Sequence, residues 1–126
     1  MNDNAQLILL ADDSMTTLSL VSARLQRTGY EVVTVTRGDD ALALTLERRP
    51  VLIVLDLEMP GLGGLEVTRT LRADPSFAAM PIILLTSDSA PERVEAGREA
   101  GANAYVVKPF SPQDLAARVD DLLGRR

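Results

Sequence analysis

The chain has 126 residues, of which 46% are hydrophobic and 25% are charged, and its formal net charge is −5. This length and composition indicate one globular domain and exclude disordered and fibrous proteins. The sequence contains neither Cys nor His, which excludes disulfides, zinc sites built from those residues, and catalysis by a histidine or a cysteine. The acidic balance argues against direct nucleic-acid binding. Without a long apolar run or a signal-peptide pattern, we expect a cytoplasmic protein that does not enter the membrane.

Five short apolar runs along the chain have the length of β-strands. They are apolar at successive positions, a pattern typical of strands that are covered on both faces of a parallel sheet. The predicted strands are Leu7–Ala11, Val32–Val35, Val51–Leu55, Ile82–Leu85 and Tyr105–Val107.

An amphipathic stretch follows each apolar run and predicts a helix. The five predicted helices are Met15–Gly29, Asp39–Arg49, Gly64–Ala73, Pro91–Ala100 and Ser111–Leu123. The large apolar residues expected to face the core are Leu18, Val21 and Leu25 in the first helix, Leu42 and Leu46 in the second, Leu65 and Leu71 in the third, and Leu115, Val119 and Leu122 in the fifth. The alternation of strands and helices predicts an α/β fold, a (βα)5 parallel sheet with helices on both sides.

The last two predicted helices differ in their local signals. Pro91–Ala100 has Val94 as its only large apolar residue and Gly97 in its interior, where glycine costs about 1 kcal/mol relative to alanine. We therefore expect this helix to be the weakest. Ser111 is placed to cap the final helix, with Pro112 at its first position.

Polar side chains follow four of the five predicted strands. The first run ends at Asp12 and Asp13, the third at Asp56, the fourth at Thr86 and the fifth at Lys108. In open α/β sheets the functional site lies at the carboxyl ends of the strands, so we expect these side chains at one rim. Each alone has an ordinary explanation as a helix cap, a turn residue or a surface charge. Their joint occurrence at four strand ends indicates a functional site.

This set of side chains suits phosphoryl transfer. Three neighbouring carboxylates repel one another, and Mg²⁺ relieves that repulsion because it binds one or two carboxylates together with waters and phosphate oxygens. A cation and a lysine neutralise a phosphoryl group during transfer, and a carboxylate can accept that group as an acyl phosphate. Asp56, at the end of the middle strand, is the predicted acceptor.

These motifs resemble the receiver domain of bacterial two-component response regulators, the CheY-like family. The matching segments are Asp12-Asp13-Ser14, Asp56-Leu57-Glu58-Met59-Pro60 followed by Gly64, Leu84-Leu85-Thr86-Ser87, and Tyr105-Val106-Val107-Lys108-Pro109-Phe110. The likeness runs from about Leu7 to Leu123. It implies a single receiver domain over residues 1–126, with its core at about 7–123, no output domain, and a doubly wound, flavodoxin-like sheet with strand order 2-1-3-4-5.

The resemblance also implies residue roles. Asp56 is expected to be the phosphoacceptor, Lys108 to pair with a phosphoryl oxygen, and Thr86 to move its hydroxyl onto the phosphoryl group. Tyr105 is expected to rotate inward with Thr86, and the Lys108–Pro109 bond to be cis. The cofactor implied is Mg²⁺, for which Mn²⁺ is expected to substitute. Its implied ligands are Asp12, Asp13, Asp56 and the backbone carbonyl of Glu58.

The implied partners are a histidine kinase or a histidine phosphotransfer protein, which supplies phosphohistidine, and an unknown downstream protein. The fourth helix, fifth strand and fifth helix are expected to form the switched interaction surface in phosphorelay signal transduction. The chain is then a phosphoacceptor that assists its own phosphorylation and dephosphorylation, and not an enzyme. We expect a monomer or a phosphorylation-dependent dimer. Asn103 and Ala104 stand where receivers joined to winged-helix modules usually carry acidic residues.

Two acidic residues are individual to this chain. Glu58 lies two residues after the predicted acceptor, and Asp88 lies two residues after Thr86. We hypothesise that both edge the pocket and set the lifetime of the phosphoryl group. The alternative is that both are solvated loop residues.

Three other functions share this fold class. Phosphatases with an aspartyl nucleophile usually carry Asp-x-Asp-x-Thr after the first strand, whereas the acceptor here follows the third. Flavin-binding electron carriers stack their ring between aromatic residues, and this chain has only two Tyr, two Phe and no Trp. The main alternative is a receiver-like protein-interaction module that is not controlled by phosphorylation.

Overall fold

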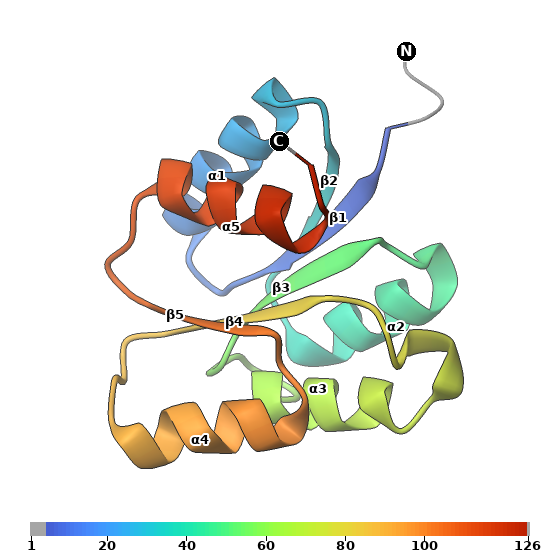
Figure 1. Ribbon diagram of the computed structural model, residues 1–126, viewed down its shortest axis with the longest axis vertical. Coiled ribbons are helices and arrows are strands. Elements are labelled where there is room, and N and C mark those ends of the chain that lie inside the picture. Colours follow the sequence, from blue (N-terminus) through green and yellow to red (C-terminus); the bar gives the residue numbers. More distant parts are fainter. Residues whose placement is uncertain (1–4, 126) are drawn as a thin grey trace.

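The computed structural model describes residues 5–125 and shows one five-stranded parallel sheet between two layers of helices (Figure 1). The strand order is β2-β1-β3-β4-β5, which confirms the predicted flavodoxin-like topology. The strands are β1 (Leu7–Ala11), β2 (Glu31–Val35), β3 (Leu52–Asp56), β4 (Ile82–Thr86) and β5 (Ala104–Val107).

Helices α1 and α5 pack on one face of the sheet, and α2, α3 and α4 lie on the other (Figure 1). Their bounds are α1 (Met15–Arg27), α2 (Gly38–Arg48), α3 (Gly64–Arg72), α4 (Pro91–Ala100) and α5 (Pro112–Leu122). The Ser111 hydroxyl accepts a hydrogen bond from the Asp114 amide at 2.9 Å, which confirms the predicted cap of α5. Within residues 5–125, no helix combines the length and the apolar character that a membrane crossing needs.

Burial follows the order of the strands. Strands β3 and β4 are buried at every position, whereas no residue of the edge strands β2 and β5 is fully buried. Alternate residues of a strand point to opposite faces, so Ile8 and Leu10 pack beneath α1 and α5 while Leu9 packs beneath the other three helices. The sheet is therefore covered on both sides, as the continuous apolar runs predicted.

The predicted inner face of α2 is wrong in part. Leu42 is only half-buried and Leu46 is 47% exposed, whereas Ala41 and Thr45 are buried. Small residues line the inner face because α2 begins against the loop after β3: a Cβ atom on Gly38 would lie 1.7 Å from the Leu62 carbonyl oxygen. Apolar spacing alone does not reveal such a close approach.

Smaller differences concern other segments. In α3, Leu71 is buried as predicted, but Leu65 is half-buried and Val67 and Thr68 complete the inner face. A short 3-10 helix at Pro75–Phe77, which the apolar pattern did not predict, begins where the Asp74 carboxylate accepts a hydrogen bond from the Ser76 amide.

Helix α4 has two buried residues, Gly97 and Ala100, and both lie in its C-terminal half. A Cβ atom on Gly97 would lie 2.8 Å from the Tyr105 ring, so glycine lets this half of the helix lie against β5. The segment directly after α4 is held by Arg72, the last residue of α3. The Arg72 guanidinium donates to the Gly101 carbonyl at 2.9 Å and to Asn103 Oδ1 at 2.8 Å. The C-terminal end of α4 is thus fixed, and its sparse burial supports the prediction that it is the weakest helix.

Candidate functional site

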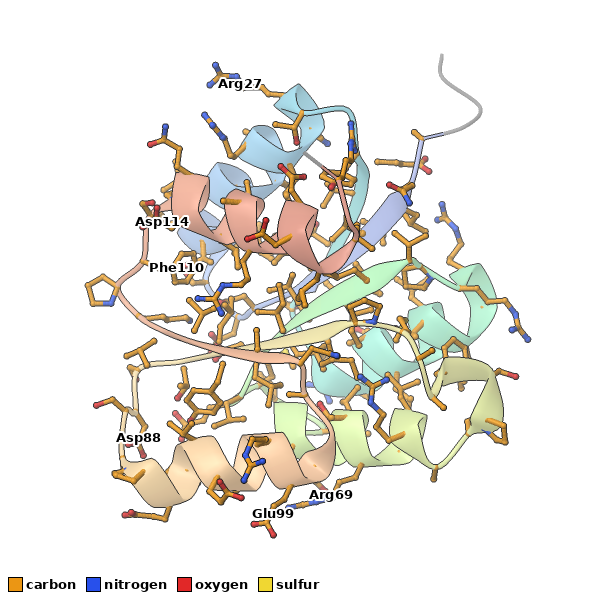
Figure 2. All side chains as sticks on the ribbon, in the orientation of Figure 1. Arg27, Arg69, Asp88, Glu99, Phe110 and Asp114 are labelled. Carbon is orange, nitrogen blue, oxygen red and sulfur yellow. The ribbon has the colours of Figure 1, made fainter. Side chains whose placement is uncertain are left out.

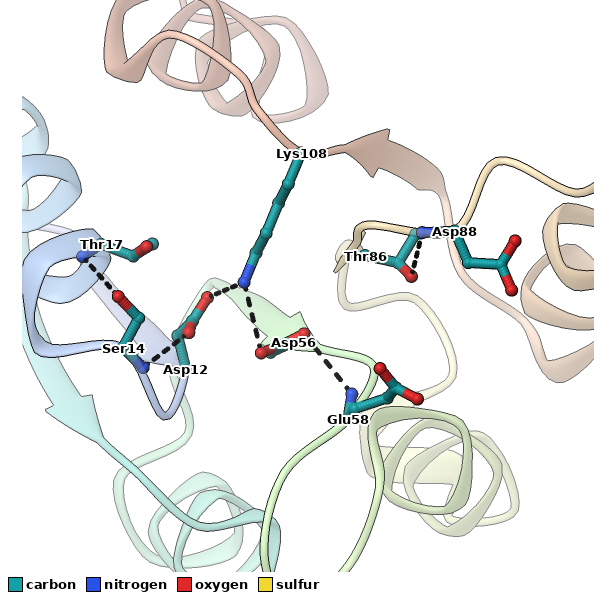
Figure 3. A network of polar contacts seen from close by, with 8 residues as sticks. All are labelled: Asp12, Ser14, Thr17, Asp56, Glu58, Thr86, Asp88 and Lys108. Atoms are coloured by element: carbon teal, nitrogen blue, oxygen red, sulfur yellow. Dashed lines mark hydrogen bonds and ion pairs between the residues drawn. The ribbon is translucent and has the colours of Figure 1, made fainter.

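The carboxyl ends of the strands bring the predicted polar side chains to one rim of the sheet (Figure 3). Asp12 and Asp13 directly follow β1, and Asp56 is the last residue of β3. Asp56 pairs with Leu85 of the neighbouring strand, so Thr86 lies one step beyond it at the end of β4. Lys108 directly follows β5.

Three carboxylates form the centre of this rim. Each of Asp12, Asp13 and Asp56 offers an oxygen, and these oxygens all lie within 4.8 Å of one another. Asp12 is fully buried and Asp56 is 6% exposed, whereas Asp13 is exposed to solvent. The charge repulsion therefore acts mainly between two buried groups.

Lys108 partly neutralises the two buried carboxylates. Its Nζ lies 2.9 Å from Asp12 Oδ2 and 3.3 Å from Asp56 Oδ2 (Figure 3). Burial alone would lower the pKa of Lys108, but its bonds to the two carboxylates and their charges outweigh that effect and raise its pKa. The ammonium is thus firmly protonated at the site.

Ionisation of the Asp56 carboxylate is disfavoured at this site. Burial and the negative charge of Asp12 raise the pKa of Asp56 from 3.8 to about 6, although Lys108 and the Glu58 amide act in the opposite direction. The Glu58 amide donates to Asp56 Oδ1 over 3.4 Å, a long hydrogen bond. Asp56 is therefore a carboxylate with few hydrogen bonds that still ionises near neutral pH.

The donor set fits a hard divalent cation. The Ser14 amide donates to Asp12 Oδ1 at 2.9 Å, but Asp12 Oδ2 is buried without a hydrogen bond and has only the ion pair with Lys108. A buried oxygen in that state gains from a further positive charge. Clustered carboxylate oxygens are the ligands that Mg²⁺ and Mn²⁺ prefer.

The loop after β3 folds tightly beside the acceptor strand. A Cβ atom on Gly64 would lie 2.7 Å from the Asp56 carbonyl oxygen, and the Gly64 amide donates to the Leu57 carbonyl at 2.9 Å. Glycine at this position therefore allows α3 to begin against the end of β3, which fixes the direction of the chain from Asp56 to Glu58.

Thr86 and Tyr105, the predicted switch residues, both bond to the backbone of Asp88. The Asp88 amide donates to Thr86 Oγ1 at 3.0 Å, and the Tyr105 hydroxyl donates to the Asp88 carbonyl at 3.2 Å. Thr86 is buried, whereas Tyr105 is half-buried. The two side chains are thus coupled through one residue of the β4–α4 loop.

The two acidic residues individual to this chain lie in different surroundings. The Glu58 side chain is exposed next to Asp56, at the edge of the carboxylate cluster (Figure 3). The Asp88 carboxylate points away from that cluster: Oδ1 accepts from the Ala90 amide at 2.9 Å, and Oδ2 lies 3.6 Å from Arg93 Nε. Asp88 therefore faces α4 rather than the pocket, and Arg93 is a neighbour that the sequence analysis did not single out.

The Lys108–Pro109 peptide bond is cis. Lys108 is also tied to the switch strand, because its amide donates to the Thr86 carbonyl at 2.6 Å.

A family model described as the response regulator receiver domain matches residues 8–120. Among curated proteins, the DNA-binding response regulator MtrA of Mycolicibacterium smegmatis is 38% identical over 125 residues, which cover 99% of this chain and 54% of MtrA. The probable transcriptional regulator ycf27 of Cyanophora paradoxa is 42% identical over 126 residues, which cover 99% of this chain and 51% of ycf27. The chain therefore spans about half the length of these curated relatives.

Solved structures give the same result. The chemotaxis response regulator CheY4 of Vibrio cholerae matches with a TM-score of 0.89 and 34% identity, covering 94% of this chain and 99% of that one. The Mn²⁺-bound form of response regulator Rcp1 matches with a TM-score of 0.79 and 29% identity, covering 93% of this chain and 91% of that one. Sequence, topology and the carboxylate cluster at the strand ends agree, and the chain belongs to the receiver domain family of two-component response regulators.

Proposed function

We propose that this chain accepts a phosphoryl group on Asp56 from a phosphohistidine donor, in a Mg²⁺-dependent reaction, and passes the signal on through a change in its surface. The observation that carries the proposal is the position of Asp56. It ends the central strand, lies next to the buried Asp12, and has Lys108 Nζ at 3.3 Å. Phosphoryl transfer needs mainly positioning and charge stabilisation, and these groups supply both.

In the proposed transfer, an Asp56 carboxylate oxygen forms a bond to phosphorus while the bond from phosphorus to the donor imidazole nitrogen breaks. The imidazole leaves with the electron pair of that bond. Lys108 neutralises one phosphoryl oxygen, and the Thr86 hydroxyl donates to another after moving toward it. Loss of the group is the corresponding hydrolysis: a water oxygen bonds to phosphorus, the Asp56 carboxylate leaves, and inorganic phosphate is released.

Asp12, Asp13, Asp56 and the Glu58 carbonyl would hold Mg²⁺, or Mn²⁺ in its place. The bound ion would neutralise the charge that develops on the phosphoryl oxygens. The buried Asp12 Oδ2, which has an ion pair with Lys108 but no hydrogen bond, supports this ligand set, as does the Mn²⁺-bound form of the related Rcp1. The chain's own part is to position the carboxylates at one rim and to pair two of them with Lys108.

The output surface proposed is α4, β5 and α5, because Thr86 and Tyr105 join the site to α4 through the β4–α4 loop. A histidine kinase or a histidine phosphotransfer protein is the proposed donor, and another protein is the proposed target. A cytoplasmic location, and a monomer or a phosphorylation-dependent dimer, remain predictions. If amide exchange in Pro91–Ala100 does not change on phosphorylation, the proposed output surface is wrong.

The test is incubation with acetyl phosphate, with and without Mg²⁺, followed by intact mass spectrometry. We expect a Mg²⁺-dependent gain of one phosphoryl group in the wild type and none in Asp56→Ala. Asp121→Ala is the matched control, because it removes an exposed carboxylate of α5 remote from the cluster. If the wild type gains nothing while it still binds Mg²⁺, the alternative of an interaction module not controlled by phosphorylation takes the place of this proposal.

A further inference from the structure

Asp88 joins the two switch side chains to the start of α4. Its backbone bonds to Thr86 Oγ1 and the Tyr105 hydroxyl, while its carboxylate accepts from the Ala90 amide and faces Arg93 Nε at 3.6 Å. Figure 2 shows Asp88 beside the first turn of α4 and Glu99 at the opposite end of the helix. A single residue of the loop thus connects the end of β4, the neighbouring strand β5 and α4.

The two ends of α4 are held in different ways. Its C-terminal end has the buried Gly97 and Ala100 and the hydrogen bonds from Arg72 to the segment that follows. At the N-terminal end, Pro91 and Glu92 are exposed and Arg93 is half-buried. The contacts of Asp88 with Ala90 and Arg93 are therefore important for holding the first turn of α4 in place.

The position of Thr86 depends on the same contacts. Its Oγ1 accepts the Asp88 amide, so Thr86 can approach Asp56 only if that hydrogen bond breaks or if residues 87 and 88 move with it. In the second case, movement of Asp88 relative to α4 would separate its carboxylate from Arg93. The resting and the switched arrangements thus compete, and the ion pair favours the resting one.

We propose that Arg93 is a positioning residue, which acts through the Asp88 carboxylate to hold Thr86 and the start of α4 in the resting arrangement. The role in switching rests on the proposed function, since it assumes that Thr86 moves toward a phosphoryl group on Asp56. Arg93 itself does not touch the carboxylate cluster. Its side chain and that of Asp88 are 39% and 48% exposed, and exposed ion pairs shift an equilibrium by roughly 1.5- to 5-fold.

The test compares Arg93→Gln with Arg98→Gln and Arg93→Lys. Arg98→Gln removes the same kind of side chain from the same helix and also breaks an ion pair, with Glu95 at 2.6 Å, but this pair does not involve Asp88. The first measurement is amide exchange of residues 86–94 without phosphodonor or metal. We expect exchange in Arg93→Gln to rise roughly 1.5- to 5-fold, with Arg98→Gln unchanged and Arg93→Lys close to the wild type.

The second measurement is the phosphorylation rate with acetyl phosphate and Mg²⁺. We expect Arg93→Gln to raise this rate by a similar factor, with Mg²⁺ affinity unchanged. The Asp88→Asn background keeps an acceptor for the Ala90 amide but removes the charge. In this background, Arg93→Gln should change neither the amide exchange nor the phosphorylation rate any further.

Two results would overturn the inference. One is unchanged amide exchange in Arg93→Gln. The other is that Arg93→Gln raises amide exchange or the phosphorylation rate as much in the Asp88→Asn background as in the wild type. The two readouts also separate this inference from the proposed function. If the wild type takes up no phosphoryl group but exchange rises as expected, the proposed function fails while the role of Arg93 in holding Thr86 and α4 stands.

Discussion

Replacing Asp56 by Asn should stabilise the metal-free protein, and the gain should grow with pH. The carboxylate of Asp56 is buried beside Asp12, and its pKa rises from 3.8 to about 6. At pH values between 3.8 and about 6, the folded protein therefore still holds a proton on Asp56 that the unfolded chain has already lost. Stability therefore falls as the pH rises through this window, and the loss is complete above a pH of about 6.

The size of the effect follows from the same shift. One pKa unit corresponds to about 1.4 kcal/mol, so a rise from 3.8 to about 6 amounts to about 3 kcal/mol at neutral pH. Asn removes this cost, keeps an oxygen for the Glu58 amide, and leaves Lys108 paired with Asp12 at 2.9 Å. We expect a net gain of about 1–3 kcal/mol, which for a domain of this size raises Tm by about 4 °C per kcal/mol.

The assay is urea denaturation of the metal-free wild type and Asp56→Asn at several pH values, followed by circular dichroism. Asp13→Asn is the matched control, because Asp13 belongs to the same cluster but is exposed. It should weaken Mg²⁺ binding while leaving metal-free stability within about 0.5 kcal/mol of the wild type, or slightly higher. A difference between Asp56→Asn and the wild type that does not grow between acidic and neutral pH would refute the reasoning.

Three further predictions concern the surroundings of the site. In the metal-free protein, the Lys108 ammonium occupies Asp12 at 2.9 Å and should therefore compete with Mg²⁺ for this carboxylate. Lys108→Met removes the ammonium, so Mg²⁺ affinity measured by calorimetry should rise roughly three- to tenfold. An unchanged affinity would show that Lys108 and Mg²⁺ do not compete. Glu58→Ala should change the rate at which the phosphoryl group is lost, measured by mass spectrometry over time, and an identical rate would leave Glu58 as a solvated loop residue. Gly97→Ala places a Cβ 2.8 Å from the Tyr105 ring, so crowding should outweigh the better helix propensity and cost about 1 kcal/mol in urea denaturation; a more stable variant would show that the ring moves freely.

Much of the fold could be predicted because the signals are local. Strands β3 and β4 are buried on both faces, as their unbroken apolar runs predict. The rim of the sheet was also predictable, since parallel strands end on the same side and Asp56 and Lys108 directly end or follow strands. Likewise, Ser111 and Pro112 mark the start of α5 by their own chemistry.

What could not be predicted depends on contacts between distant segments. Leu46 reads as a core residue by spacing, but the loop at Leu62 approaches Gly38 so closely that the small residues of α2 face inward. The orientation of Asp88 is a similar case. Its distance of two residues from Thr86 suggested a place in the pocket. The carboxylate instead faces the start of α4, where it accepts from the Ala90 amide and lies 3.6 Å from Arg93 Nε.

The anchoring of α4 at its C-terminal end has a mechanical consequence. Because Gly101 is held by Arg72, any tilt of the helix would pivot about its C-terminal end. Ten residues at 1.5 Å each make α4 about 15 Å long, so a tilt of about 10° displaces Pro91 by about 2.6 Å and Ala100 hardly at all. A partner that contacts the first turn of α4 would therefore sense the whole displacement, whereas one that contacts its last turn would sense almost none.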